Sequence, residues 1–333
     1  MTVSIIIAVK TWAENLEECV ARCAELDFKD FEIIVLPDEN RDCPRRGLSL
    51  FSNTELSLGR QPPAVRIIST GPVKPADKRD IALKHAKGEV LAFLDDDAYP
   101  VKDWLRNALL NFEDKDVAAV GGPAITPLND SYLQKASGNI YASFLVSGNF
   151  RYRYIPQKKR KVDDFPSCNF LVRKSVMDEL GGFDTKFWPG EDTKLCLDIT
   201  KKLKKKIIYD PRVLVYHHRR KVFSPHLKQI ASYAFHRGYF VKKYPETSLK
   251  LAYFIPTLFL LFLIGGFILS FFCAFSKALY LEVLSLYLIL AFVTSISIPI
   301  IITPLVFVGI VLTHLTYGFY FVKGLFAPKM PEE

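Results

Sequence analysis

Apolar runs alternate with amphipathic stretches along the first 220 residues. Each run has four to seven residues and is bounded by turn-forming residues, which predicts strands. These runs are Val3–Val9, Phe31–Leu36, Val65–Ser69, Val90–Leu94 and Val117–Val120. Apolar residues at helical spacing occupy the segments between them, at Leu16–Leu26, Ala76–Ala86 and Trp104–Phe112. Strands that alternate with helices predict an α/β domain with a mostly parallel central sheet.

The pattern changes after residue 220. Pro225–Tyr244 alternates aromatic and basic residues at helical spacing, which predicts a helix lying on a bilayer surface, with a core helix as the alternative. Ala252–Phe275 carries no charge and would be about 36 Å long as a helix, enough to cross a bilayer. Leu279–Val322 suits two further crossings separated by a proline turn, or a re-entrant or in-plane pair.

These changes predict three regions. Residues 1–222 form the α/β domain, 223–250 the interfacial helix region, and 251–325 an all-α transmembrane region of about three spans. The lysines before the first span place the α/β domain in the cytoplasm of a multi-pass cell-membrane protein. Three crossings would put Lys329 outside, which suits the positive-inside tendency less well.

Composition supports this division. The net charge of +9 is concentrated before residue 250, and the apolar first strand has no basic flank that would make it a signal peptide. The six cysteines show no paired metal spacing, which favours a reduced, cytoplasmic setting. We expect membrane lipids and no nucleic acid among the partners, and a homo-oligomer is left open.

Three adjacent carboxylates, Asp95, Asp96 and Asp97, follow the apolar run Val90–Leu94. They cannot all be ionised in a core, so they must face water, a metal ion, or both. In open α/β sheets, ligands bind at this end of the strands. Asp95 and Asp97 can therefore hold one hard divalent cation that bridges a diphosphate. A solvated acidic turn is the alternative.

Lys78 and Arg79 lie at the start of the predicted helix Ala76–Ala86, where basic groups and unpaired amides favour an anion. Glu191 and Asp192 open a later helix, just after Trp188. A tryptophan beside an acid is suited to holding a sugar ring against a catalytic carboxylate. The alternatives are a solvated helix face for the first pair and helix capping for the second.

A basic cluster follows the predicted strand Val213–Tyr216. One of His217 and His218 is a candidate third metal ligand beside Asp97, and the arginines after them are candidates for contacting a diphosphate. A basic surface next to the membrane is the alternative. The arginines are Arg219 and Arg220.

Seven segments together resemble the family-two glycosyltransferases, which are inverting enzymes with a GT-A fold. They are IIIAVK, EIIVLPDE, a basic KRD helix start, FLDDDA, CNFLVRK, GGFD and GEDTKLCLDI, and the resemblance covers about residues 1–220. It implies a nucleotide-sugar donor, a DXD element that binds Mg²⁺ or Mn²⁺, Asp192 as general base and Glu191 as its neighbour. The implied donor contacts are Ala8, Val9, Lys10, Asp38, Glu39, Lys78, Arg79, Asp95 and Asp96, and the implied acceptor contacts are Asn169, Trp188 and Gly190.

The QxxRW motif of processive polysaccharide synthases is not evident, which favours transfer of a single sugar. We therefore expect a membrane-anchored transferase that moves a sugar, with a lean towards a UDP-sugar, to a hydroxyl of a lipid-linked or cell-surface glycan. One alternative is a synthase that charges a polyprenyl phosphate, although an anionic acceptor needs no base. Others are a cytidylyltransferase-like enzyme, for which no glycine-rich phosphate loop is visible, and an inactive membrane scaffold.

Overall fold

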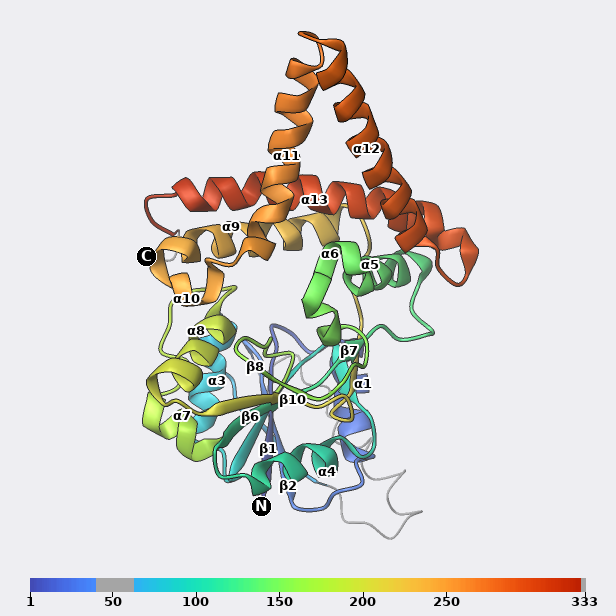
Figure 1. Cartoon of the computed structure of the whole chain (residues 1–333). Helices are drawn as coiled ribbons and strands as arrows, with labels where there is room; N and C mark the ends of the chain where they lie inside the picture. The colour runs from blue at the N-terminus through green and yellow to red at the C-terminus, as the bar shows by residue number, and fades with distance from the viewer. Residues whose placement is uncertain (40–62, 331–333) are drawn as a thin grey trace. The chain divides into compact units, whose positions relative to one another are not determined.

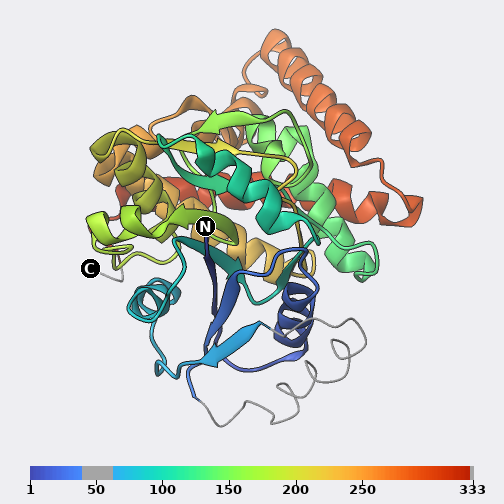
Figure 2. The same ribbon diagram turned by 90° about the horizontal axis from the view of Figure 1, so that it is seen from below.

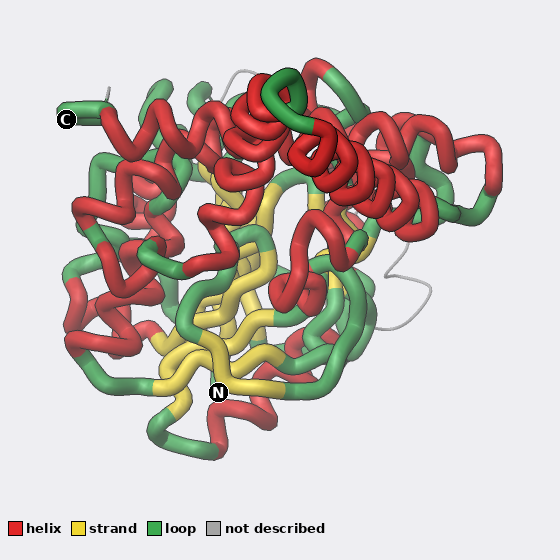
Figure 3. Tube along the Cα trace, turned by 45° about the horizontal axis from the view of Figure 1, so that its top comes forward, coloured by secondary structure: helices red, strands yellow, loops and turns green. Residues whose placement is uncertain are grey.

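The computed structural model describes residues 1–39 and 63–330, which form two compact units. The first unit comprises residues 1–125 and 155–217, and the second comprises residues 126–154 and those from 218 onward. The polar, proline-containing sequence between the predicted strands Phe31–Leu36 and Val65–Ser69 predicts a long loop at 40–64, and this stretch lies almost wholly outside the described residues. Every strand of the described residues belongs to the first unit, and the described part of the second is built from helices and the loops between them. Figure 3 colours the strands yellow and the helices red.

The described residues of the first unit form eleven strands and several short helices. The strands are β1 (Val3–Ala8), β2 (Phe31–Leu36), β3 (Ala64–Ile67), β4 (Val90–Asp95), β5 (Ala98–Pro100), β6 (Val117–Gly121), β7 (Ala124–Ile125), β8 (Arg160–Val162), β9 (Asn169–Arg173), β10 (Lys206–Tyr209) and β11 (Val215–His217). The helices are α1 (Glu14–Ala24), α3 (Pro75–Leu83), α4 (Trp104–Leu109), η2 (Leu110–Glu113), α7 (Lys174–Leu180), α8 (Glu191–Leu197) and the π-helical turn η4 (Asp198–Lys202).

Eight strands form the central sheet in the order β3-β2-β1-β4-β9-β6-β10-β8. Strands β3, β2, β1 and β4 are parallel, as are β6 and β10, whereas β9 runs antiparallel between β4 and β6. The predicted α/β fold with a mostly parallel sheet is therefore confirmed.

Apolar side chains fill both faces of the central strands. Helix α1 covers one face, where its Leu16 and Val20 join Ile5 and Val35 in the core. Helix α3 lies on the opposite side of β1 and β2 in both Figure 1 and Figure 2. Strands covered on both faces read as continuous apolar runs, which is why they were visible in the sequence.

The register aligns the carboxyl ends of the central strands. Ala8, the last residue of β1, pairs with Leu36 of β2 on one side and with Asp95 of β4 on the other. The polar residues that follow each strand therefore emerge at one edge of the sheet. A second, three-stranded sheet, β5-β11-β7, takes up the chain after β4.

The second unit contains α5 (Tyr132–Ala142), α6 (Phe144–Ser147), η3 (Gly148–Arg153), α9 (Ser224–Lys243), α10 (Pro245–Ser248), α11 (Leu251–Leu269), α12 (Ala274–Ser295), η5 (Ile300–Ile302) and α13 (Thr303–Phe326). By length and composition, three of its segments can cross a membrane: α11, α12 and the segment 300–326 that contains α13. Within this unit, α11 and α12 form a hairpin, whereas α13 lies crosswise to them and beside α9 (Figure 1).

Candidate active site

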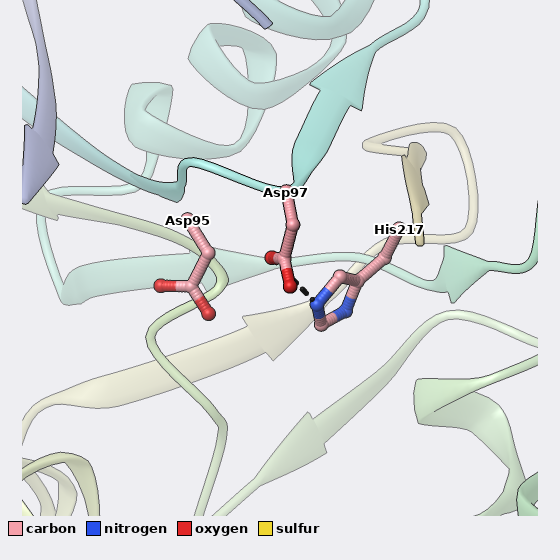
Figure 4. A group of neighbouring side chains, drawn as sticks. All are labelled: Asp95, Asp97 and His217. Atoms are coloured by element: carbon pink, nitrogen blue, oxygen red, sulfur yellow. Dashed lines mark ion pairs between the residues drawn. The ribbon is translucent and has the colours of Figure 1, made fainter. Parts of the chain in front are cut away.

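The candidate metal centre consists of Asp95, Asp97 and His217. Each offers one ligand atom, and these atoms lie within 4.8 Å of one another. Figure 4 shows the two carboxylates and the imidazole approaching from the end of β4, the turn after it, and the end of β11. The Nε2 atom of His217 lies 3.0 Å from Oδ1 of Asp97. The structure thus assembles a donor set from residues 122 positions apart in the sequence.

The small sheet places the histidine. Strand β11 pairs antiparallel with β5, and His217 stands opposite Ala98, the residue after Asp97. Pairing at this register brings the imidazole next to the aspartate turn. The neighbouring His218 instead lies in the second unit, where its Nδ1 atom is 2.5 Å from Oδ1 of the buried Asp130. Of the two histidines left open by the sequence, His217 is the one beside Asp97.

Burial acts strongly on the aspartates of this turn. It is the main cause that raises the pKa of Asp95, with Asp97 adding to the effect and the Arg79 guanidinium opposing it. Burial, followed by repulsion from Asp97 and Asp95, raises the pKa of Asp96 to about 7. Adjacent carboxylates with raised pKa values favour a bound cation, because a cation removes the repulsion between them. Carboxylate oxygens are ligands that Mg²⁺ and Mn²⁺ accept, so the residues present fit such an ion.

Arg79 connects the aspartate turn to the start of α8. One terminal nitrogen of its guanidinium lies 3.1 Å from Oδ1 of Asp95, and the other lies 3.0 Å from Oε1 of Glu191. The side chain is 4% exposed and lies near the rings of Phe93 and Phe183. The aspartate turn and the acidic start of α8 are therefore joined by one buried cation.

Glu191 and Asp192 differ in their surroundings. Glu191 is buried, pairs with Arg79, and accepts a hydrogen bond from the Gly190 amide at 3.1 Å. Gly190 has φ of +119°, a conformation that a residue with a Cβ rarely adopts, and it turns the chain into α8. Asp192 is only half-buried, and its Oδ1 accepts a hydrogen bond from the Thr193 amide. Asp192 is therefore the more accessible carboxylate of the pair.

Trp188 lies three residues before the first residue of this helix, and its side chain is 48% exposed. An exposed indole beside a half-buried carboxylate retains the arrangement that the sequence predicts for an acceptor sugar. Asn169, the other polar residue expected to contact the acceptor, is fully buried. Its amide accepts from Trp104 and donates to the carbonyls of Gly122 and Val213, so all three of these bonds stabilise the domain.

The residues expected to contact the donor gather at the ends of β1 and β2. Lys78 is buried, and its ammonium group donates to Asp38 at 2.5 Å and to the carbonyls of Val9 and Leu36. Ala8 ends β1, and Lys10 and Glu39 are exposed just beyond these strands. Lys78 thus stabilises the strand ends and positions Asp38.

Arg219 and Arg220, expected to contact a diphosphate, belong to the second unit. The Arg219 guanidinium lies over the rings of Tyr141 and Tyr154, at 5.7 and 5.3 Å from their centroids, and Arg220 is exposed. The sequence carried no signal for these two tyrosines or for Asp130, because they lie about 65 to 90 residues away in segments without a motif.

An open, mostly parallel sheet with carboxylates at the ends of its strands is the arrangement of α/β domains that bind ligands at this edge of the sheet. A family model described as Glycosyl transferase family 2 matches residues 4–181, more than half of the chain. The chain therefore belongs to this family, as the sequence motifs predicted.

Two curated relatives agree with this assignment. A pre-mycofactocin glycosyltransferase of Mycobacterium tuberculosis is 32% identical over 146 residues, which is 44% of this chain and 30% of the relative. The glycosyltransferase AglE of Haloferax volcanii is 22% identical over 196 residues, which is 57% of this chain and 58% of the relative. The matched regions thus span less than two thirds of either relative.

Two solved structures share the GT-A fold. A mannosyltransferase from Pyrobaculum calidifontis, in complex with GDP-Man and Mn²⁺, has a TM-score of 0.55 at 19% identity and covers 98% of this chain and 88% of its own. The transferase GalNAc-T7, with UDP, GalNAc and Mn²⁺, has a TM-score of 0.50 at 17% identity and covers 75% of this chain and 51% of its own. The predicted GT-A fold is confirmed.

Proposed function

We propose that this chain is an inverting transferase that moves one sugar from a nucleotide-sugar to a hydroxyl of a lipid-linked glycan at the cytoplasmic face of a membrane. In this proposal residues 1–222 carry the chemistry, 223–250 lie at the bilayer surface, and 251–325 anchor the chain. The observation that carries the proposal is the Arg79 bridge, because it holds the aspartate turn and the α8 carboxylates at one site.

Asp192 acts as the general base in this proposal. It takes the proton of the acceptor hydroxyl while the hydroxyl oxygen bonds to the anomeric carbon. The bond from that carbon to the diphosphate oxygen breaks, and its electron pair leaves with the nucleoside diphosphate. Attack opposite the leaving group inverts the anomeric centre. A positioned base contributes about 10²–10⁴-fold to the rate.

Asp95, Asp97 and His217 would hold the divalent ion, which when bound supplies positive charge for the diphosphate. Mg²⁺ prefers all-oxygen surroundings, so the imidazole nitrogen in the donor set favours Mn²⁺. Both solved relatives contain Mn²⁺, which supports this choice. One of those structures carries GDP-Man and the other carries UDP, and we propose a UDP-sugar for this chain.

The acceptor is proposed from two features. Trp188 offers an exposed aromatic face next to Asp192, which suits a sugar ring that carries the attacking hydroxyl. The apolar helices α11 and α12 would keep the enzyme where a lipid-linked substrate is concentrated. A hydroxyl acceptor needs a base, and the half-buried Asp192 can provide one.

The proposed base is tested with Asp192→Asn in the full chain. We expect turnover to fall by about 10²-fold or more while the Kd for the nucleotide-sugar changes little. Asp178→Asn is the matched control, because Asp178 is an acid that pairs with Lys174 on the surface of α7. Turnover in the Asp192 variant equal to that of the control would remove Asp192 from this role.

The donor and acceptor are tested with a panel of radiolabelled nucleotide-sugars, each assayed with Mn²⁺ and with a chelator. We expect a UDP-sugar to be used only with the metal, and the label to enter a glycan on lipid through a glycosidic bond that resists mild acid. Label in an acid-labile sugar-phosphate lipid would favour the polyprenyl-phosphate synthase instead.

A further inference from the structure

We infer that α11 and α12 cross the bilayer as a hairpin and that α13 lies in the plane of the membrane surface beside α9. This inference rests on the membrane anchoring proposed above and extends it by assigning which segments cross. The sequence alone favours three crossings, which would place Lys329 on the side opposite Lys250. The hairpin arrangement places both lysines on one side.

Helix α13 is in backbone contact with α9. A Cβ added at Gly238 of α9 would lie 2.1 Å from the carbonyl oxygen of Phe321, and one added at Gly324 would lie 1.9 Å from that of Phe235. Glycine at both positions permits this close approach, as small residues do wherever helices pack tightly. The two helices therefore cannot separate without breaking a close-fitting interface.

A buried polar contact extends this interface towards the start of both helices. The Nε2 atom of His226 in α9 lies 3.0 Å from the hydroxyl of Thr313 in α13, and its Nδ1 atom lies 2.8 Å from the Ser137 hydroxyl of α5. From Thr313 to Gly324 the contacts cover twelve residues, and the eleven steps between them extend about 17 Å along α13. Helix α13 therefore lies along α9 over much of its length.

Helix α9 is too polar to cross a bilayer. It carries Lys228, Arg237, Lys242 and Lys243, and it is not among the segments of the described residues that can span by length and composition. Each lysine or arginine at the centre of a membrane costs about 2.5–3.5 kcal/mol. That cost keeps α9 at the membrane surface. Because α13 is packed along α9, α13 must lie at a similar depth in the membrane.

The surface of α13 fits this position. In an 18-residue apolar window of the segment 300–326, which contains α13, 39% of the residues are buried within the protein, compared with 6% in such a window of α11 and 11% in that of α12. The buried residues include Val306, Ile310 and Thr313, which recur at helical spacing on one face. Val308 and Phe319 are exposed and apolar. A helix with one face packed on protein and an apolar outer face suits the boundary between headgroups and acyl chains.

The hairpin projects away from α13. Near its start, α11 contacts α13 through the Thr257 hydroxyl, which donates to the Gly318 carbonyl at 3.1 Å, and through the ring of Phe259 near His314. From Phe259 to the end of α11 at Leu269, ten residues extend about 15 Å. Adding the helix diameter of about 10 Å for α13 gives about 25 Å, close to the hydrocarbon thickness of about 30 Å.

The second helix of the hairpin, α12, extends a similar distance beyond α13. His314 of α13 accepts or donates a hydrogen bond at 2.9 Å to the hydroxyl of Tyr287 in α12, and from Tyr287 back to Ala274 the helix extends about 20 Å. Phe262 and Tyr280 pack together further out, with ring centroids 5.4 Å apart. If α13 lies at the boundary between headgroups and acyl chains on one side of the membrane, a hairpin of this length brings residues 270–273 to the opposite membrane surface.

The charges agree with two crossings. Exposed Lys242 and Lys243 before the hairpin and exposed Lys323 and Lys329 after it then share one side, as the positive-inside tendency favours. Glu282 of α12 would lie within the bilayer at a cost of about 3 kcal/mol. The eleven Leu, Ile, Val and Phe residues of α12 contribute about 3–7 kcal/mol in the favourable direction, so α12 still inserts.

Cysteine labelling in cells that express the full chain tests this topology. Cys273 is exposed at the tip of the hairpin, whereas the other described cysteines are buried. In a Cys43→Ser background, we expect a membrane-impermeant maleimide to modify Cys273 in intact cells. In the variant Cys273→Ser/Lys329→Cys, we expect the maleimide to modify the cysteine at position 329 only after the cells have been permeabilised. Lys161→Cys in the catalytic unit, also carrying Cys273→Ser, is the matched control for the cytoplasmic side.

Modification of Lys329→Cys in intact cells would overturn the inference, because α13 would then cross. Modification of Cys273 only after permeabilisation would overturn it as well, because the hairpin would then not reach the far surface. Extraction of the same membranes at high pH separates these failures from that of the proposed anchoring. A chain released by this wash is not membrane-anchored, whereas a chain that stays in the pellet with an unexpected labelling pattern has a different topology.

Discussion

Replacing Arg79 by methionine should destabilise the first unit. The methionine keeps much of the apolar contact with Phe93 and Phe183 but removes both ion pairs. Glu191 would then be left in a position where its side chain is 7% exposed, without its charged partner. Removing one member of a buried ion pair costs about 3–5 kcal/mol.

The Asp95 pair contributes less to this loss. Asp95 is 34% exposed, and pairs accessible to water are worth about 0–1 kcal/mol. The Glu191 pair therefore accounts for most of the expected effect. For a unit of this size, a loss of 3–5 kcal/mol lowers Tm by roughly 6–20 °C. The measurement is the thermal unfolding of the full chain in detergent, followed by tryptophan fluorescence.

A double-mutant cycle with Glu191→Gln separates this pair from other effects of the substitution. We expect the double variant to lose less unfolding free energy than the sum of the losses of the two single variants, with a coupling energy of about 1–3 kcal/mol. Arg79→Lys should recover only part of the stability, because an ammonium group cannot bond both carboxylates in the planar geometry of a guanidinium. A coupling energy near zero would refute the view that Arg79 joins the two acidic segments.

Three further predictions address the metal centre and the helix interface. Because the pKa of Asp96 is raised to about 7, the folded metal-free protein binds more protons than the unfolded chain between about pH 4 and 7. The Tm measured with a chelator should therefore fall as the pH rises through this range. Addition of Mn²⁺, or the substitution Asp96→Asn, should remove this fall. In Mn²⁺ titrations, His217→Ala should weaken binding by about 10- to 100-fold, whereas His218→Ala should change it little. Gly238→Ala should cost about 1–3 kcal/mol of unfolding free energy, whereas Gly265→Ala, whose Cβ would meet nothing within 4 Å, should cost none.

The sequence predicted the parts of the fold that depend on neighbouring residues. β1, β2 and β4 are apolar over their whole length because both faces of the sheet are covered, and each begins and ends close to the expected residue. The acids after β4 were recognisable because three carboxylates cannot be buried without a partner. Their position at the edge of the sheet followed from the general arrangement of parallel strands.

The side chains that contact those acids could not be predicted, because their positions depend on how segments far apart in the sequence pair and pack in the fold. Arg79 was expected at a solvated or anion-binding helix start, but it lies buried between Asp95 and Glu191, 16 and 112 positions away. Choosing between His217 and His218 required the pairing of β11 with β5, which a run of three residues does not reveal. Asn169 looked available for an acceptor, yet its amide bonds three groups on other segments.

The assembled site has a charge distribution that bears on its chemistry. Asp95–Asp97, Glu191 and Asp192 contribute five carboxylates, and Arg79 is the cation that bonds two of them. A nucleoside diphosphate carries further negative charge and would be repelled by such a surplus. One divalent ion at the aspartate turn would reduce this surplus where the diphosphate binds in the proposed reaction, and Arg79 balances the charge of the buried Glu191. A metal at the aspartate turn and the proposed base Asp192 are therefore compatible, because the arginine between the two acidic segments offsets charge at Glu191.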